Sequence, residues 1–439
     1  MLGWLLNLCY AAVLLAASPW IAWAAWRHGK HREGFGQKLL GSVPRREGDA
    51  PCLWLHAVSV GEVNLLRVLI DEIERRGWPC EVVVSTTTRT GYDLARKKYA
   101  GHAVFYCPLD FTWAVRRAVR RVRPTALVLA ELELWPNLIR AAGDAGATVA
   151  VVNGRLSDNS FVGYRRLRPL VKRVLNQLDL IAAQDEATAE RFVALGARTV
   201  ATHATGSLKF DGVETDRTNP RTAELRRLAG FTDGNIVFLA GSTQEPEERY
   251  ALDAYRSLAE EFPKLRLVLV PRHPERFNTV AALLDESGLP WTRRSTLSNP
   301  QSAIRNPQST ILLVDTVGEL GAWWGTAHIG FVGGSFGDRG GQNMLEPAAF
   351  GVATSFGPNT RNFRDIVARL LAGDGAVQLT EPAKLQAFIR RCLDEPAWAS
   401  GLTNRSRALV NGQQGAVGRT VDLLESLVPA KGDQASEAA

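Results

Sequence analysis

Acidic side chains follow two apolar runs that are typical of β-strands, and they are the first candidates for chemistry. Glu62 comes shortly after the run at 52–56. Its position fits a first-turn acid that favours the helix dipole, and it equally fits a general base at a ligand-binding edge. Glu131 and Glu133 follow the run at 126–130, and both would point the same way if the strand continued. They predict a ligand-binding or catalytic pair, with capping or a salt bridge as the alternative.

Further polar residues follow other apolar runs. Asn153 and Arg155 come after 148–152, and Lys209 lies in the segment GSLKFD. Because the carboxyl ends of parallel strands meet at one edge of a sheet, these residues are consistent with a single site.

The second half of the chain repeats this arrangement. Gly-Ser-Thr at 241–243 would present backbone N–H groups and hydroxyls to an anion. Arg272 would supply a fixed charge for a phosphate, with His273 as a further donor. The glycines at 333–334 permit close approach to a ligand, and Glu346 can accept hydrogen bonds from ribose hydroxyls.

Several nucleotide- and metal-binding motifs are absent from the sequence. There is no P-loop, no G-x-G-x-x-G after a strand, no D-x-D and no H-E-x-x-H. Nothing therefore requires a metal or another cofactor. A donor with one phosphate could be held by Arg272, Lys209 and helix N-termini.

The elements that would carry these side chains alternate between short apolar runs and helical stretches. Such strands are typical of parallel sheets covered on both faces. Two successive sets predict an α/β protein with two doubly wound, Rossmann-like domains, and the polar stretch 209–222 predicts the break between them. The expected strands are 52–56, 81–85, 126–130, 148–152, 179–183, 200–204, 236–240, 266–270, 311–314, 328–332 and 352–355.

The N-terminal segment 2–26 contains no charged side chain and is long enough to cross a membrane. Basic residues follow this run and none precedes it, which favours an uncleaved single-pass anchor over a signal peptide or a buried soluble helix. The positive-inside bias predicts that the body is cytoplasmic. Two basic amphipathic stretches, 113–123 and 164–175, would contact anionic headgroups or a phosphorylated lipid, or form solvated helix faces.

Composition excludes other classes of protein. The 439 residues are 46% hydrophobic and 22% charged, which excludes a disordered or coiled-coil chain. Five scattered cysteines exclude a disulfide scaffold and favour a reducing compartment. The formal net charge of +7 is concentrated in the front half. The low-complexity stretch 298–310 predicts a surface loop, and 430–439 a disordered tail.

Eight short motifs, in their order, resemble those of the 3-deoxy-D-manno-octulosonic acid (Kdo) transferases, which build the inner core of lipopolysaccharide. The resemblance runs from the N-terminal segment to about residue 365. It implies a GT-B glycosyltransferase fold with an interdomain cleft, inversion at the anomeric carbon and no metal. The motifs are HAVSVGE, ELELWPN, NGRLS, GSLKFD, GST followed by EE, PRHPERF, VDTVGEL and GGQNMLEP.

The resemblance also implies residue roles. Glu62 matches the catalytic base, and Glu131 and Lys209 match positions that stabilise the transition state. Other positions are expected to bind the substrates. They are Ser59, Gly61, Glu133, Asn153 and Arg155 in the front domain, and Ser242, Thr243, Pro271, Arg272, His273, Val317, Gly318, Glu319, Gly333, Gly334, Asn343, Met344, Leu345 and Glu346 in the back domain.

Three positions depart from the family pattern. Gln244 and Gln342 stand where His is frequent, and Val317 stands where Met is frequent. Glutamine can donate a hydrogen bond but does not titrate.

With the apolar N-terminal segment, the resemblance implies a membrane-anchored enzyme that transfers Kdo from CMP-Kdo to a lipid A precursor. Segment 2–26 is the transmembrane anchor, 27–212 the acceptor-binding domain, 222–429 the CMP-Kdo-binding domain and 430–439 the tail. The expected location is the cytoplasmic side of the inner membrane, with anionic headgroups as partners and no nucleic acid. The alternatives are another GT-B glycosyltransferase with a different donor and lipid acceptor, or an idle carbohydrate- or lipid-binding module.

Overall fold

A computed structural model describes residues 2–28, 33–298 and 310–428 and divides into two compact units. The first unit contains residues 1–212 and 413–439, and the second contains Val213–Gly412. The second unit thus begins inside the stretch 209–222. The predicted loop and tail lie, apart from residues 298 and 310, outside the described residues.

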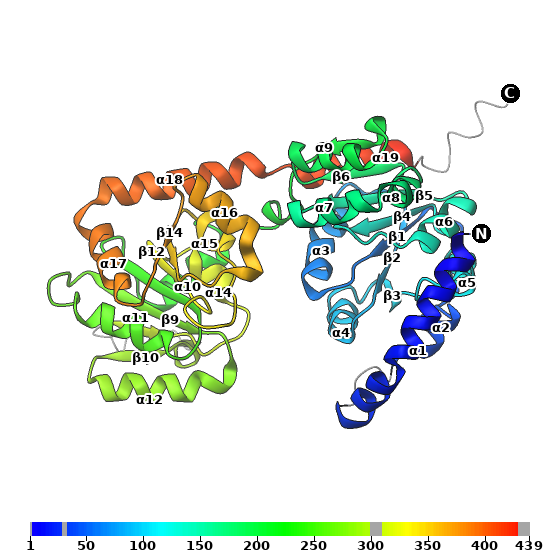
Figure 1. The fold of residues 1–439 in the computed structure, drawn as a ribbon. Coiled ribbons are helices and arrows are strands. Elements are labelled where there is room, and N and C mark those ends of the chain that lie inside the picture. The colour runs from blue at the N-terminus through cyan, green and yellow to red at the C-terminus, as the bar shows by residue number, and fades with distance from the viewer. Residues whose placement is uncertain (1, 29–32, 299–309, 429–439) are drawn as a thin grey trace. The chain divides into compact units, whose positions relative to one another are not determined.

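The first unit is built on a seven-stranded parallel sheet with the order β3-β2-β1-β4-β5-β6-β7 (Figure 1). Each expected strand of the first set is present to within two residues, and β3 is an additional strand. The strands are β1 (Cys52–His56), β2 (Glu81–Thr86), β3 (Ala103–Tyr106), β4 (Ala126–Ala130), β5 (Thr148–Gly154), β6 (Leu180–Ala183) and β7 (Thr202–Ala204).

Helices cover both faces of this sheet. The described helices of the unit are α1 (Leu2–His28), α2 (Phe35–Leu40), α3 (Val60–Arg75), α4 (Arg89–Lys98), α5 (Thr112–Val122), α6 (Pro136–Asp144), α7 (Asp158–Arg166), α8 (Arg168–Leu175), α9 (Glu186–Leu195) and α19 (Ala416–Leu427). The basic stretch 164–175 is therefore two helices, and Pro169 lies in the first turn of the second one.

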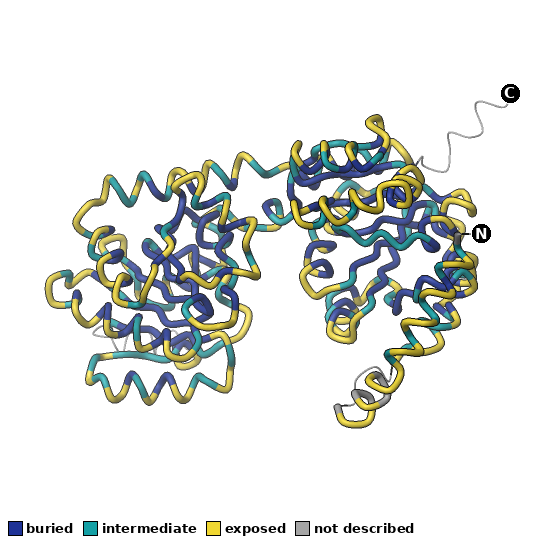
Figure 2. Tube along the Cα trace, in the orientation of Figure 1, coloured by how far each residue is buried: buried dark blue, intermediate teal, exposed yellow. Residues whose placement is uncertain are grey.

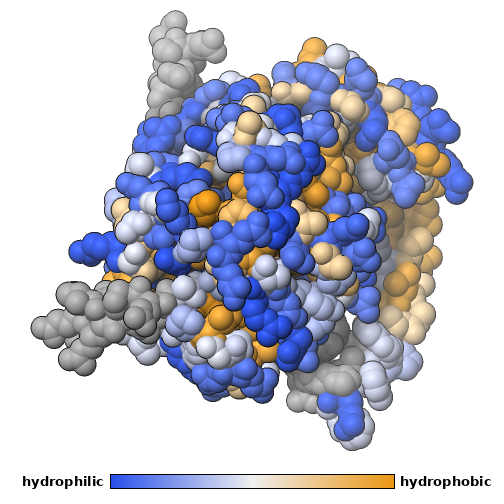
Figure 3. All heavy atoms as spheres, turned by 90° about the vertical axis from the view of Figure 1, so that its left-hand side faces the viewer, coloured by the Kyte–Doolittle hydropathy of each residue, from blue (hydrophilic) through white to orange (hydrophobic). Residues whose placement is uncertain are grey.

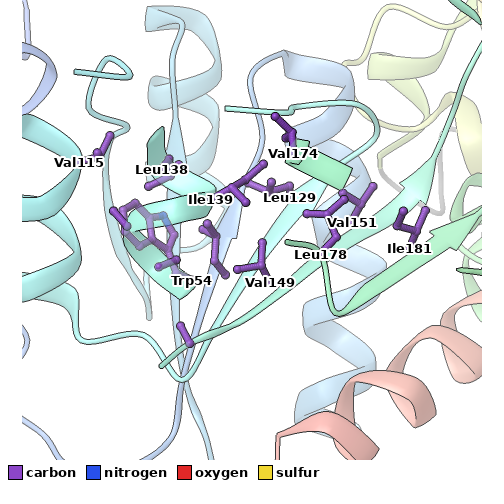
Figure 4. Close-up of a cluster of buried hydrophobic side chains, with 14 of the residues drawn as sticks. Trp54, Val115, Leu129, Leu138, Ile139, Val149, Val151, Val174, Leu178 and Ile181 are labelled. Carbon is purple, nitrogen blue, oxygen red and sulfur yellow. The ribbon is translucent and has the colours of Figure 1, made fainter. Parts of the chain in front are cut away.

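Alternate strand residues bury their side chains on opposite faces. Trp54 packs with Leu138 and Ile139 of α6 on one face (Figure 4). Leu55 packs with residues of α3 and α19 on the other face. Figure 2 shows the strands buried and the outer helix faces exposed. Burial on both faces explains why these strands read as nearly continuous apolar runs.

The last helix, α19, belongs to the first unit, whereas the predicted second domain, 222–429, included it. Its apolar side packs on α3 and the sheet. Arg76, at the end of α3, forms ion pairs with Asp422 at 2.6 Å and Glu425 at 3.0 Å. The carboxylate of Asp211 accepts hydrogen bonds from two backbone N–H groups near the start of α19.

Helix α1 is the one described helix that is long and apolar enough to cross a membrane. Its beginning packs against the first unit. Asn7 donates to Thr112 Oγ1 at 2.8 Å and accepts from the N–H of Thr112 at 3.1 Å, so α1 caps α5. Tyr10 Oη donates to Asp110 at 3.1 Å. Toward its other end, Trp20, Trp23 and Trp26 are exposed.

The second unit also has a seven-stranded parallel sheet, with the order β10-β11-β9-β8-β12-β13-β14. Its strands are β8 (Ile236–Thr243), β9 (Leu265–Pro271), β10 (Trp291–Arg293), β11 (Ile311–Leu313), β12 (Ile329–Val332), β13 (Ala353–Phe356) and β14 (Val377–Gln378). Its described helices are α10 (Pro220–Leu228), α11 (Glu247–Arg256), α12 (Phe277–Ser287), α14 (Leu320–Trp324), α15 (Leu345–Ala349), α16 (Arg364–Ala372), α17 (Lys384–Asp394) and α18 (Pro396–Gln413). The face in Figure 3 is mostly hydrophilic, with scattered hydrophobic residues.

Candidate active site

The strand order reverses between β1 and β4 in the first unit, and between β8 and β12 in the second. Such reversal points are where open α/β sheets bind ligands, beyond the carboxyl ends of the strands. Most of the predicted site residues follow these strands or an immediate neighbour, whereas Lys209 follows β7, and Val317, Gly318 and Glu319 follow β11.

Glu62 sits in the first turn of α3 and is held by three hydrogen bonds. Ser59 is the N-cap, and its Oγ accepts the N–H of Glu62 at 3.3 Å. The same hydroxyl donates to Glu62 Oε1 at 2.7 Å, and the N–H of Val58 donates to Oε2 at 2.8 Å. Glu62 is 9% exposed, and this burial raises its pKa while the hydrogen bonds oppose the rise. It is therefore both a helix-capping residue and a carboxylate held in one orientation.

Glu131 and Glu133 lie beyond the end of β4. The strand stops at Ala130 and Glu131 takes a left-handed φ of 58°, so the expected alternation along a continuing strand does not apply. Glu131 Oε1 accepts a hydrogen bond from Lys209 Nζ at 2.9 Å. Burial raises the pKa of Glu133 to about 7, with contributions from the charges of Glu62 and Glu131. The structure thus brings the three carboxylates together.

Lys209 is positioned by Asn153, which is fully buried and has a left-handed φ of 54°. Asn153 Oδ1 accepts hydrogen bonds from the N–H of Leu208 at 3.0 Å and the hydroxyl of Ser207 at 3.3 Å. Its buried Nδ2 has no protein partner among the described residues. Arg155 follows at the same edge and is half-buried, while Gly61 is exposed next to Glu62.

In the second unit, Ser242 and Thr243 end β8, so they belong to the strand and not to a helix N-terminus. The buried Oγ1 of Thr243 has no partner among the described residues. Arg272 and His273 follow β9, whose last residue, Pro271, is buried. The side chain of Arg272 is exposed, and its N–H donates to Thr243 O at 3.0 Å.

The remaining predicted residues of the second unit differ in exposure and in hydrogen bonding. Val317 is 78% exposed. Glu319 is already hydrogen-bonded by Arg294 at 3.0 Å and Thr316 at 2.7 Å. Gly318 has a φ of +88°, Gly333 and Gly334 follow β12, and Met344 and Leu345 are buried.

Glu346 lies in the first turn of α15. Its Oε1 accepts a hydrogen bond from Asn343 Nδ2 at 3.0 Å, and burial raises its pKa. Across residues 2–28, 33–298 and 310–428, no group of three or more His, Cys, Asp and Glu side chains is arranged to hold a metal ion.

Sequence reasoning missed the role of Glu247, whose carboxylate binds backbone amides nearly ninety residues further along the chain. No local pattern signals such a partner. The only sequence cue is an acidic residue after Gly-Ser-Thr, which also fits a first-turn helix acid.

Comparison with known proteins agrees with this architecture. Residues 29–212 match the family described as "3-Deoxy-D-manno-octulosonic-acid transferase (kdotransferase)". The chain is 32% identical to 3-deoxy-D-manno-octulosonic acid transferase from Haemophilus influenzae, over 96% of this chain and 95% of the relative. It is 33% identical to the Bordetella pertussis protein of the same name, over 95% and 98% of the two chains.

Two solved structures show the same fold at low identity. UDP-GlcNAc 2-epimerase from Neisseria meningitidis, bound to UDP-GlcNAc, has a TM-score of 0.56 and 13% identity, covering 86% of this chain and 100% of its own. Acinetobacter baumannii MurG has a TM-score of 0.52 and 13% identity, covering 86% of this chain and 99% of its own. With the near-full-length relatives above 30% identity, this chain belongs to the Kdo transferase family and is a glycosyltransferase of the GT-B fold.

Proposed function

We propose that this enzyme transfers Kdo from CMP-Kdo to a lipid A precursor, with inversion at the anomeric carbon and Glu62 as the general base. The observation that carries this proposal is the carboxylate of Glu62, which is held in one orientation at the end of β1 beside the Glu131–Lys209 pair. A general base needs this fixed geometry and a pKa shifted toward the working pH.

The reaction follows from these groups. An acceptor hydroxyl oxygen attacks the anomeric carbon of Kdo while its proton passes to Glu62. The bond from that carbon to the phosphate oxygen breaks, and CMP leaves with the electron pair. Lys209 and Glu131 stabilise the transition state, and Lys209 offsets the negative charge that develops as CMP leaves.

The proposed binding residues divide between the two units. Ser59, Gly61, Glu133, Asn153 and Arg155 serve the acceptor. Arg272 supplies the charge for the single phosphate, and no divalent ion is needed. The other proposed donor residues are Ser242, Thr243, Pro271, His273, Val317, Gly318, Glu319, Gly333, Gly334, Asn343, Met344, Leu345 and Glu346.

We also propose that the enzyme works at the cytoplasmic face of the inner membrane. Helix α1 supports this location with its exposed apolar side chains. The surface of α7 and α8 supports it too, because Leu167 and Leu170 are exposed beside Arg165, Arg166 and Arg168. A surface that combines apolar and basic side chains suits an anionic bilayer.

The test is a transfer assay with CMP-Kdo, generated in situ, and a tetraacylated lipid A precursor, with products read by mass spectrometry. We expect Glu62→Gln to lower kcat by about 10²–10⁴-fold while acceptor binding remains. Glu74→Gln is the matched control, because Glu74 lies on the same helix and is exposed. Full activity in Glu62→Gln would overturn the assignment of the base, and a wild-type enzyme that transfers no Kdo would overturn the proposed function.

A further inference from the structure

One buried carboxylate ties together the loops at the carboxyl ends of β8 and β12. Glu247, the first residue of α11, is 1% exposed. It accepts hydrogen bonds from the backbone N–H groups of Gly334 at 2.6 Å, Ser335 at 2.9 Å and Phe336 at 3.0 Å. It also accepts the N–H of Gln244 at 3.0 Å. Successive amides that converge in this way form an anion-binding nest, and here the anion belongs to the chain itself.

The same loops are in close backbone contact. The N–H of Gly333 donates to Gly241 O at 2.9 Å. A Cβ at position 333 would lie 2.6 Å from both Ser242 O and Thr243 Cα. The amides of residues 333–336 are therefore occupied within the unit, and a bound phosphate has to find its donors elsewhere.

We propose that Glu247 is a positioning residue for the nucleotide donor. It fixes the loop at 333–336 as one wall of the donor pocket and leaves phosphate recognition to side chains, namely Arg272 and the hydroxyls of Ser242 and Thr243. This inference rests on the proposed function, because it takes the donor to bind in the second unit. The unpartnered Oγ1 of Thr243 supports it, since this buried hydroxyl beside the loop still has hydrogen-bonding capacity.

Glutamine cannot replace Glu247 in this arrangement. Both carboxylate oxygens accept two amide N–H groups each, with Gly334 and Gln244 on Oε2 and Ser335 and Phe336 on Oε1. A glutamine has one oxygen and one NH₂, so one pair of amides would face another donor. The two hydrogen bonds made by one of the carboxylate oxygens are then lost.

The matched control is the next residue in the chain. Glu248 is also 1% exposed, but its carboxylate is bound by the side chain of Arg276, with Nη2 at 3.1 Å. Glu248→Gln therefore makes the same chemical change at the same burial without touching the loop at 333–336. Glu247→Asp keeps the charge on a shorter side chain and serves if Glu247→Gln folds poorly.

The first measurement is hydrogen exchange on the full-length protein without ligand. We expect Glu247→Gln to lose at least tenfold in protection at residues 334–336, and Glu248→Gln to keep wild-type protection there. Unchanged protection in Glu247→Gln would show that Glu247 does not fix the loop at 333–336, whatever nucleotide the enzyme uses.

The second measurement tests whether the loop held by Glu247 affects binding of the nucleotide donor. We expect Glu247→Gln to raise the Kd for CMP and the KM for CMP-Kdo by about tenfold or more, while kcat and the KM for the lipid acceptor change less than about threefold. A loss of stability alone would not raise the KM for CMP-Kdo while leaving kcat nearly unchanged. Wild-type affinity for CMP in Glu247→Gln would overturn the positioning role. If the wild-type protein itself failed to bind CMP, the proposed donor would be wrong. The exchange measurement would still show whether Glu247 fixes the loop at 333–336.

Discussion

The carboxylates at the end of the first sheet are held in different ways, and this difference decides what each can do. Glu62 is hydrogen-bonded by Ser59 and Val58, and Glu131 is paired with Lys209. Glu133 accepts a hydrogen bond from Trp135 Nε1 at 3.1 Å but has no cationic partner among the described side chains. Burial, and after it the charges of Glu62 and Glu131, therefore oppose the ionisation of Glu133.

This arrangement makes stability depend on pH. Burial and the charges of Glu62 and Glu131 raise the pKa of Glu133 from 4.5 to about 7, so the folded protein binds this proton more tightly than the unfolded chain does. The resulting stabilisation is fully present below the unfolded pKa and is lost as the pH rises through about 7. We expect the thermal midpoint of the wild type, relative to that of Glu133→Gln, to fall between about pH 5 and about pH 8.

Thermal unfolding across this pH range checks the prediction, with Glu190→Gln, an exposed position on α9, as the control. Parallel pH profiles of the wild type and Glu133→Gln would contradict it.

At this scale the sequence located the strand-end residues but not their partners. Glu131 and Lys209 are recognisable as polar residues after apolar runs, yet their ion pair joins residues 78 positions apart. The buried contacts of Asn153 and Glu247 are equally non-local. Spacing along the chain carries no information about such pairs, because the topology of the sheet brings them together.

At the scale of elements, the strands that sequence analysis missed share one property. β3, β10 and β14 each form an edge of a sheet. An edge strand has one neighbour and is less buried, so it needs no long apolar run. β14 has only two residues and is partly exposed. The central strands were predicted because burial on both faces leaves a strong apolar pattern.

The contact between the ends of β8 and β12 allows a test at the same scale. Gly333→Ala would place a Cβ 2.6 Å from Ser242 O, where the rigid backbone cannot give way. We expect it to lower the free energy of unfolding by about 1–3 kcal/mol and to weaken CMP binding. Chemical denaturation and nucleotide titration measure both effects. Gly337→Ala is the control, because a Cβ there meets nothing within 4 Å. Equal behaviour of the two variants would refute the prediction.

At the scale of the whole molecule, the chain returns to its first unit at the end. The sequence predicted the break at 209–222 and assigned residues 222–429 to the second domain, whereas the second unit runs from Val213 to Gly412 and α19 belongs to the first. The apolar spacing of α19 indicates that one side is buried but does not say against which sheet. That choice depends on contacts with α3, including the Arg76 ion pairs with Asp422 and Glu425.

We therefore expect substitutions in α19 to destabilise the first unit. Leu424 is fully buried, and Leu424→Ala should lower the free energy of unfolding of that unit by about 2–5 kcal/mol. Leu427→Ala, on the same helix at a position 38% exposed, should change it by less than about 0.5 kcal/mol. Hydrogen exchange in the first sheet resolves which unit is affected. A loss of protection confined to the second unit would contradict the assignment of α19.

The attachment of α1 also has a consequence for the way in which a lipid substrate reaches the enzyme. Asn7 and Tyr10 fasten its beginning to the first unit. Just beyond its end, Glu33 accepts a hydrogen bond from Tyr106 Oη at 3.3 Å and lies 3.4 Å from Arg89. The beginning of α1 and the later residue Glu33 thus both contact the first unit. If α1 enters the membrane as proposed, these contacts keep the first unit at the membrane surface, and a lipid substrate reaches the enzyme by diffusion in two dimensions.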